Sequence, residues 1–375
     1  MFSSKRLSLA RKRRRLTAKG LAQEAGVSPV TITRLENGQN EAVPETVEKL
    51  AEALGYPTDF FYQEDQSALT KEVVSFRSLK SMSAKERDAA LSAGEIGVEV
   101  YSWLDGHFNL PDLDLPPFDP ELTPETAAEA LRQHWGLGYE PIPNLLKLLE
   151  AKGIRVLGLE ENTANVDAFS FWEEGRAYVF LNSYKSAERS IFDAAHELGH
   201  LVLHKHGTTP VGSKNTKEPN PFEDSRNVEV EANRFAAAFL MPEEDVRLRL
   251  PRFITADVII KAKRRWRVSA MALAYRVHHF QRPMLTEWQY RSICIELGKR
   301  GYRSGEPEGI TRESSVLWKM VLSELWSDRK NLRHIADDLA LPVGEVEMLL
   351  SGILPQADRT EASGGGSRPA LRVVK

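Results

Sequence analysis

The spacing of hydrophobic positions predicts three helical stretches in this chain. From the N-terminus to about residue 62, apolar residues recur at intervals of three and four, which is typical of short packed helices. The same intervals recur over residues 83–110 and again from residue 256 to about residue 352. Between the first two stretches, residues 63–66 are polar and predict a hinge.

The middle of the chain mixes helical signals with short apolar runs that predict strands. The runs cover residues 154–159, 168–172 and 177–181, and Glu173-Glu-Gly-Arg176 predicts a hairpin turn between the last two. Thr123 before Pro124 is a helix start signal, and a second short helix is expected over residues 144–152. Two longer helices follow, one through His196 and His200, and one over residues 226–240.

These elements predict a mainly α protein with a small β-sheet, of the α+β class. The expected parts are an all-α head, a central domain of mixed helices and strands, and a helical C-terminal region. We place the boundaries at residues 1–62 for the head, 63–118 for a linker and helical segment, 119–285 for the central domain, 286–355 for the C-terminal region and 356–375 for a disordered tail.

Composition narrows the classes of protein. The 375 residues carry a net charge of −3, but residues 5–19 contain eight Lys or Arg and no acid, which favours local binding to a polyanion. A single cysteine, Cys294, excludes internal disulfides and metal sites built from several thiolates. The sequence has no apolar run of membrane-spanning length and no secretory signal, so a cytoplasmic location without a membrane partner is expected.

The run His196-Glu-Leu-Gly-His200 is the main candidate for chemistry. On a helix, His196 and His200 lie one turn apart on one face and can reach one cation, for which zinc is the first candidate. Glu197 lies beside them, where a carboxylate can act as general base and acid on a water that the metal activates. Two histidines satisfied within a core are the alternative, which the apolar surroundings of the pair make less attractive.

A zinc site of this type needs a third ligand. His204 lies two helical turns beyond His196, about 12 Å along the axis, so a structural or supporting role suits it better. Glu229 and Asn233 share a face of the next helix, where Glu229 can ligate and Asn233 can support a ligand histidine. Glu231 points away from Glu229, so both cannot serve one metal, and a solvated charge remains the alternative for either.

Residues 193–204 and 229–242 resemble the paired helix motifs of the ImmA/IrrE family of metallopeptidases. The runs Trp135-Gly-Leu-Gly138, Pro141-Ile142 and Val179-Phe-Leu-Asn182 add to the resemblance, which covers roughly residues 76–280. It implies a compact zincin with His196, His200 and Glu229 as metal ligands and Glu197 as the catalytic residue. Manganese or iron stays open as the metal, because histidine and carboxylate suit these ions also.

The residues for stabilising an oxyanion stay undecided. Tyr184, Arg189 and His206 are candidates, and each is more often a surface residue. The edge of the strand at residues 168–172 or 177–181 could pair with an extended substrate backbone. Core packing of their aromatic side chains is the alternative.

The N-terminal helices contain a helix-turn-helix pattern. Thr17 and Ser28 are expected N-caps, Gly26 permits the turn, and Gly38 ends the second helix. Residues 6–61 resemble the helix-turn-helix of Cro/C1-type repressors, the XRE family, although Ala18 stands where glutamine is common. The resemblance and the charge pattern give a set of expected contacts with double-stranded DNA: Arg11, Arg13, Arg14, Lys19, Ser28, Val30, Thr31 and Arg34.

A second stretch, at residues 335–350, mimics helix-turn-helix spacing near the end of the chain. It carries few positive charges, so we interpret it as helical packing.

The combined hypothesis is a zinc endopeptidase coupled to a DNA-binding head. The resemblance implies a protein substrate, often a repressor of a mobile element or a stress response, and a homodimer is compatible with the head. One rival is a non-enzymatic regulator whose metal domain senses a ligand or a partner. Another is a toxin–antitoxin or phage-defence component. An intact Glu197 favours the enzyme, because holding a metal does not need it.

Overall fold

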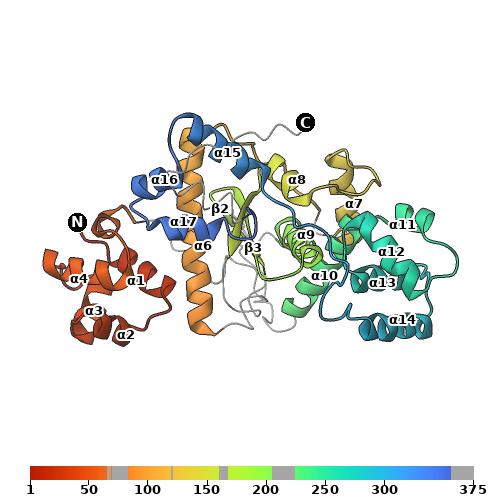
Figure 1. Ribbon diagram of the computed structural model, residues 1–375, viewed down its shortest axis with the longest axis horizontal. Coiled ribbons are helices and arrows are strands. Elements are labelled where there is room, and N and C mark those ends of the chain that lie inside the picture. The colour runs from red at the N-terminus through yellow and green to blue at the C-terminus, as the bar shows by residue number, and fades with distance from the viewer. Residues whose placement is uncertain (66–68, 70–82, 120, 160–167, 205–223, 356–375) are drawn as a thin grey trace, which may run out of the picture.

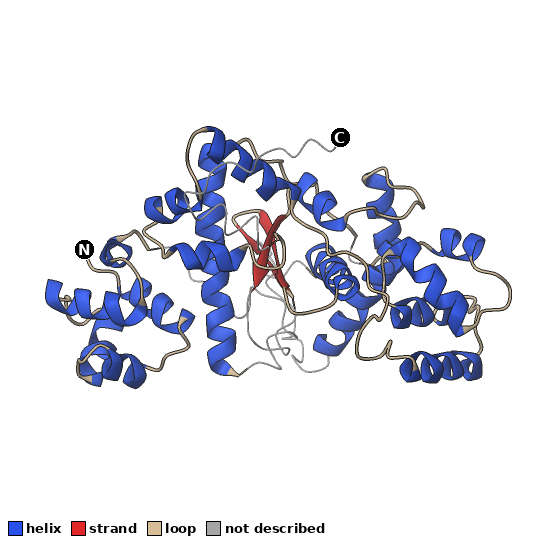
Figure 2. Ribbon diagram, viewed as in Figure 1, coloured by secondary structure: helices blue, strands red, loops and turns tan. Residues whose placement is uncertain are grey.

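The computed structural model describes residues 1–65, 69, 83–119, 121–159, 168–204 and 224–355. In this part of the chain, helices surround one three-stranded sheet (Figures 1 and 2), which confirms the predicted mainly α class with a small sheet. The predicted tail at 356–375 lies outside the described residues.

The head consists of four helices and a 3-10 turn, which lie at one end of the molecule in Figure 1. Its elements are α1 (Ser4–Arg13), α2 (Ala18–Glu24), α3 (Pro29–Glu36), α4 (Pro44–Leu54) and η1 (Thr58–Tyr62). Thr17 and Ser28 accept hydrogen bonds from Gly20 N and Thr31 N, as N-caps do. Gly26 and Gly38 both have φ of 65°, the left-handed conformation that the turn and the helix end require.

The sheet has the order β1-β3-β2 and is built from β1 (Arg155–Leu159), β2 (Phe169–Glu173) and β3 (Arg176–Asn182). β1 runs parallel to β3, and β2 and β3 form the predicted hairpin, with Glu173 opposite Arg176. Each strand lies within one or two residues of its predicted run. Glu174 and Gly175 have positive φ, which a two-residue hairpin loop favours.

Helices cover both faces of this sheet. The long helix α6 (Ala84–His107) approaches one face closely because Gly97 has no side chain: a Cβ there would lie 2.6 Å from the ring of Phe180. On that face the rings of Phe169, Phe171 and Phe180 stack on one another. The neighbouring residues of β2 alternate to the other face, where α9 (Ala187–Leu203) packs.

The remaining helices extend the body on either side of the sheet. They are α7 (Pro124–His134), α8 (Leu145–Ala151), α10 (Asp224–Leu240), α11 (Glu243–Arg249), α12 (Ala256–Trp266), α13 (Ala270–His278), α14 (Glu287–Lys299), α15 (Val316–Ser327), α16 (Leu332–Asp338) and α17 (Val343–Leu349). Figure 1 shows α12 to α14 at the end opposite the head, whereas α15 to α17 return across the body toward it. Thr123, the predicted helix start, accepts a helix N–H group, and so do Asn144 and Ser269 at the starts of α8 and α13.

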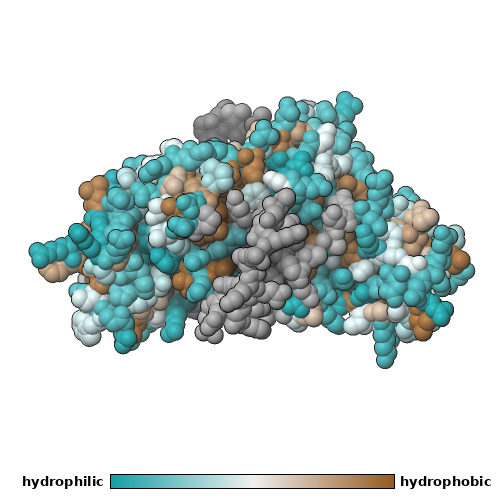
Figure 3. Space-filling view, turned by 180° about the vertical axis from the view of Figure 1, so that it is seen from behind, coloured by the Kyte–Doolittle hydropathy of each residue, from teal (hydrophilic) through white to brown (hydrophobic). Residues whose placement is uncertain are grey.

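The surface in Figure 3 is mainly hydrophilic, with apolar residues in small separate groups. None of the helices in the described part of the chain combines the length and apolar character that crossing a bilayer requires.

Candidate functional site

His196, Glu197 and His200 lie on the inner side of α9, which packs against the sheet. Ser186 caps the helix, and most of its apolar residues are buried. Glu197 and His200 are almost fully buried, at 3% and 2% exposure, and the His196 side chain is 14% exposed. The amphipathic pattern therefore places two imidazoles and a carboxylate where bulk water has little access.

Helix α10 brings Glu229 to the two histidines. It packs along α9 at Gly199, where a Cβ would lie 3.1–3.2 Å from Phe235 and Ala232, so a larger residue would push the helices apart. Glu229 is buried at 5% exposure. The glycine inside the His-Glu-x-x-His run thus serves packing, and the packing sets the distance between the histidines and Glu229.

The three side chains converge with spacings that suit a tetrahedral zinc. The two Nε2 atoms of His196 and His200 are 3.0 Å apart, and oxygens of Glu229 lie 3.3 Å from His196 Nε2 and 3.5 Å from His200 Nε2. Ligands held about 2.0–2.1 Å from a tetrahedral zinc are about 3.3–3.4 Å from one another. The donor set and its spacing therefore fit one divalent ion.

Supporting hydrogen bonds fix the ring orientation of both histidines. Nδ1 of His196 donates to Oδ1 of Asn233 at 3.2 Å. Nδ1 of His200 lies 3.1 Å from Nδ1 of His204, whose Nε2 lies 3.0 Å from Oε2 of Glu231. When Nδ1 of His200 and Nε2 of His204 each carry a proton, both contacts in this series are hydrogen bonds. Nε2 of His200 then keeps a lone pair that can bind a metal.

Burial and neighbouring carboxylates act oppositely on these rings. Burial alone would lower the pKa of His196, but the hydrogen bond to Glu229 and the charges of Glu197 and Glu229 raise the pKa above its ordinary value. Burial lowers the pKa of His204 despite its bond to Glu231, which favours a neutral ring. The cluster thus attracts positive charge at His196 and keeps His204 neutral.

Glu197 is held by the sheet. Oγ of Ser170 on β2 donates to Oε2 of Glu197 at 2.7 Å and also lies 3.3 Å from its backbone oxygen. A carboxylate oxygen of Glu197 lies within 4.8 Å of donor nitrogens on both His196 and His200. The carboxylate is therefore next to the three convergent donors, close enough to reach a water held there.

A groove of about 550 Å³ opens onto this cluster. One wall is α9, and the other is the start of α13, which contributes Met271, Ala272 and Tyr275. A second groove of about 770 Å³ continues from it, and the two share Ala237 and Tyr275 as lining residues. The site is therefore an open cleft that an extended chain can enter.

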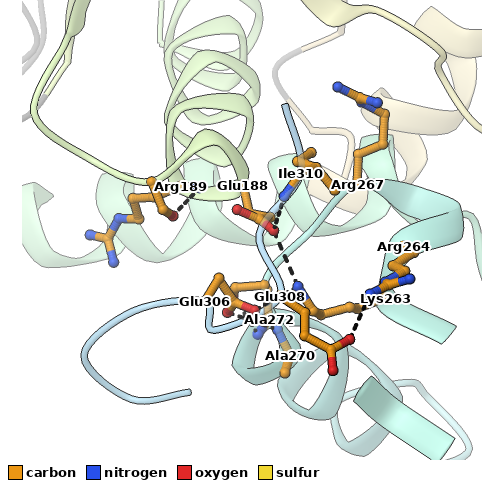
Figure 4. Close-up of polar contacts among 12 residues, drawn as sticks. Glu188, Arg189, Lys263, Arg264, Arg267, Ala270, Ala272, Glu306, Glu308 and Ile310 are labelled. Carbon is orange, nitrogen blue, oxygen red and sulfur yellow. Dashed lines mark hydrogen bonds and ion pairs between the residues drawn. The ribbon is translucent and has the colours of Figure 1, made fainter. Parts of the chain in front are cut away.

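A buried charge cluster connects the two walls of the groove (Figure 4). Nζ of Lys263 on α12 lies 3.1 Å from Glu188 at the start of α9 and 2.7 Å from Glu306. Glu306 accepts a hydrogen bond from Ala270 N, the first residue of α13. Lys263 is fully buried, so this cluster fixes the position of α9 relative to α13.

In the head, the expected DNA contacts fall into two groups. Lys19, Ser28, Val30 and Arg34 are exposed on α2 and α3, with Val30 57% exposed, and Thr31 is half-buried. The arginines at the end of α1 have partners inside the protein instead: Arg11 forms a two-pronged ion pair with Glu36, and Arg13 and Arg14 both bind Glu345 of α17.

This placement gives Arg11, Arg13 and Arg14 partners inside the protein, which their interpretation as phosphate contacts did not foresee. Arg13 is buried at 8% exposure, and the Nε–H groups of Arg13 and Arg14 donate to Glu345 and to the backbone oxygen of Leu54. A local count of charges could not show that a carboxylate more than 300 residues away would neutralise them.

Sequence reasoning missed other residues at the metal cluster. Ser170 was recognisable only as one hydroxyl between Phe169 and Phe171 in an apolar run. Met271 and Tyr275 carried no signal, because helix periodicity does not say which helix will line a groove. Of the oxyanion candidates, Arg189 lines the groove, Tyr184 is exposed, and His206 lies outside the described residues.

Comparisons with known proteins find two families in this sequence. Residues 7–61 match the family model described as helix-turn-helix, and residues 149–278 match the peptidase family model described as IrrE N-terminal-like domain. No curated protein matches the sequence. Five chains of solved structures match.

One of these chains is described as a Mycobacterium tuberculosis transcriptional regulator. It is 18% identical, the match covers 51% of this chain and 52% of that chain, and the TM-score is 0.30. The chain thus spans about half the length of that protein. The two family matches by themselves identify the chain as a fusion of an XRE-type helix-turn-helix domain, at residues 7–61, with an IrrE-like domain of a peptidase family, at residues 149–278.

Proposed function

We propose that the protein is a zinc-dependent endopeptidase coupled to a DNA-binding domain. Its substrate would be a repressor or another regulator, whose cleavage controls transcription of a mobile element or a stress response. The observation that carries the proposal is the convergence of His196, His200 and Glu229 at 3.0–3.5 Å, with Glu197 beside them in an open groove.

The three convergent side chains would hold the metal, which when bound supplies Lewis acidity toward a carbonyl and lowers the pKa of water. Glu197 accepts the proton of the attacking water and returns it to the leaving amine. Ser170 orients this carboxylate through its hydrogen bond to Oε2. Asn233 and His204 keep the histidine rings turned toward the cluster.

The groove suits a polypeptide in extended form. β2 is an edge strand among the described strands, and Ala168, the residue before it, lines the groove. An extended substrate segment can pair with such an edge through its backbone, which sets its direction without demanding a particular sequence.

The first test of this proposal identifies the cleaved protein. Cells that express the wild type are compared with cells that express Glu197→Gln by labelling all protein N-termini. We expect new N-termini in one or a few regulators in the wild type only. Equal sets of N-termini, with both variants expressed and metal-loaded, would favour the sensing regulator over the peptidase.

Metal content is expected to depend on the histidine pair. The wild type should retain about one zinc per chain, and His196→Ala should lose most of it, since two remaining ligands hold zinc far more weakly than three. Elemental analysis after gel filtration measures this. The matched control is His107→Ala, an exposed histidine at the end of α6. Equal zinc content in the wild type and in His196→Ala would contradict the assignment of His196 as a metal ligand.

DNA binding is expected to weaken steeply as salt rises. Arg34→Ala should lower affinity and reduce the slope of log affinity against log salt by about one, if one phosphate contact is lost. The control is Arg252→Ala, an exposed arginine far along the chain. Fluorescence anisotropy with a duplex at several salt concentrations gives the slopes. An affinity for DNA that does not change with salt would contradict binding through charged contacts with the phosphates.

A further inference from the structure

Residues 331–352 repeat the backbone of the head's helix-turn-helix with one constant offset and no gap. Asn331 caps α16 as Thr17 caps α2, and both accept a backbone N–H through the side chain. The turn residues Ala340 and Gly26 both have positive φ, 50° and 65°. The end residues Gly352 and Gly38 also correspond, with φ of 78° and 65°.

The packing of the two motifs corresponds as well. Each turn is closed by the same hydrogen bond, from Leu341 N to Ala336 O at 2.8 Å and from Val27 N to Ala22 O at 3.0 Å. Four buried positions of the first motif have buried, apolar equivalents in the second. These pairs are Leu21 and Ile335, Ala22 and Ala336, Ile32 and Val346, and Leu35 and Leu349.

The charge of the second motif argues against a nucleic-acid partner. Residues 331–352 contain four acids, Asp337, Asp338, Glu345 and Glu347, and Arg333 as the one Lys or Arg. Binding to a duplex depends on neutralising phosphates with basic side chains, which this motif lacks.

The reading face of a helix-turn-helix is the side of its second helix that would contact bases. In the second motif, this face is occupied by the head. By the constant offset, Glu345 and Met348 stand where Thr31 and Arg34 stand in the first motif. Glu345 is 1% exposed and binds Arg13 at 2.8 Å as well as Arg14, and it accepts the hydroxyl hydrogen bond of Tyr56 at 3.1 Å. Arg13 also lies 3.5 Å from the sulfur of Met348.

The opposite side of the same motif is fixed to the peptidase sheet. α17 packs against β1, and Gly158 of β1 has no side chain where the backbone of Ser351 passes: a Cβ there would lie 1.8 Å from Ser351 O. A Cβ at Gly352 would likewise lie 2.6 Å from Ser183, just beyond β3. Figure 1 shows α17 between the head and the sheet.

We propose that residues 331–352 form a second helix-turn-helix, whose reading face binds the basic helix α1 of the chain's own DNA-binding head instead of a nucleic acid. The motif thereby docks the head onto the peptidase domain. The head's own reading helix, α3, stays open to DNA, because its exposed residues lie outside this contact.

Glu345 is held ionised in this contact. Burial would raise the pKa of Glu345, but the charges of Arg13 and Arg14 outweigh it and hold the pKa below its ordinary value. The same burial and the charge of Glu345 raise the pKa of the Tyr56 hydroxyl, which stays protonated and donates. The contact is therefore present throughout the neutral range.

Hydrogen exchange of the full chain tests the docking. Glu345→Gln should speed amide exchange in α1 and α17 on the order of tenfold or more, since a hydrogen bond to a charged group is worth at least that factor. Exchange in α9 and α10 should not change. The control is Asp337→Asn, which removes the same charge at an exposed position of α16.

A second variant keeps the proposal open to refutation if Glu345→Gln fails to fold. Arg14→Gln alters a partly exposed partner of Glu345 and should also loosen α1 and α17. DNA affinity and its salt slope should stay within about twofold of the wild type in both variants. Unchanged amide exchange of α1 and α17 in both variants would overturn the docking. A loss of DNA affinity in Arg14→Gln would show that α1 contacts DNA, and would also contradict the proposal.

The head of a second copy is the other occupant to exclude. Arg13→Cys combined with Met348→Cys replaces two side chains that contact each other, and Cys294→Ser removes the native thiol. A bifunctional maleimide, which spans the length that the arginine side chain had filled, should give a cross-linked monomer on denaturing gels. A cross-linked dimer would show that the motif binds the head of another chain, and would overturn docking within one chain.

Discussion

Glu197→Gln is expected to lower the rate of peptide cleavage by about 10²–10⁴-fold, the usual contribution of general acid–base catalysis. Glutamine keeps the size of the side chain and can still contact Ser170. It cannot accept a proton from water at neutral pH, so the chemical step slows while the zinc and the fold remain. Single-turnover cleavage of the substrate, with zinc content measured on the same sample, gives both quantities.

Glu229→Gln should behave differently, because it weakens a charged ligand. We expect it to lose zinc together with activity, and excess zinc in the assay should restore part of the cleavage. Glu324→Gln is the control, since Glu324 is an exposed carboxylate on α15 that does not line the groove. Cleavage that survives in Glu197→Gln would place the reacting carboxylate elsewhere.

Lys263→Met is expected to lower the free energy of unfolding by about 3–5 kcal/mol, the typical cost of removing one partner from a buried ion pair. Lys263 is the cation between Glu188 and Glu306, both of which are also buried. Without it, two carboxylates face each other away from water. Urea unfolding followed by circular dichroism measures the loss, with the exposed Lys261→Met on the same helix as the control.

The loss in Lys263→Met should shrink as the pH falls. Burial already raises the pKa of Glu306 above its ordinary value in the wild type, and removing the cation raises it further. A carboxyl whose pKa is higher in the folded state takes up a proton on folding, so its penalty fades as the pH falls toward the unfolded value. An equal loss at pH 5 and pH 8 would contradict the electrostatic explanation.

Local signals predicted most elements of the fold. Caps at Thr17, Ser28, Thr123 and Ser269 begin helices, because a side-chain oxygen there satisfies an N–H that the helix leaves unpaired. The His196 and His200 pairing followed from helical geometry alone. The order of the sheet did not follow, because strand pairing depends on contacts between segments far apart in the chain.

The contacts that sequence reasoning did not foresee have the same physical origin. Arg13 and Arg14 are neutralised by Glu345, and Glu197 is held by Ser170; each pair joins segments that sequence periodicity cannot connect. The second helix-turn-helix was visible as spacing near residues 335–350. Only the backbone angles at Ala340 and Gly352 show that it shares the conformation of the first.

The central claim is that His196, His200 and Glu229 together bind one metal ion. X-ray absorption at the zinc edge of the loaded full-length protein tests it most directly. We expect a first shell of nitrogen and oxygen at about 2.0–2.2 Å, with the scattering pattern of two imidazoles and no sulfur. In His200→Ala the imidazole signal should fall. A zinc–sulfur distance of about 2.3 Å, which Cys294 alone could supply, or an unchanged spectrum in His200→Ala, would contradict the account.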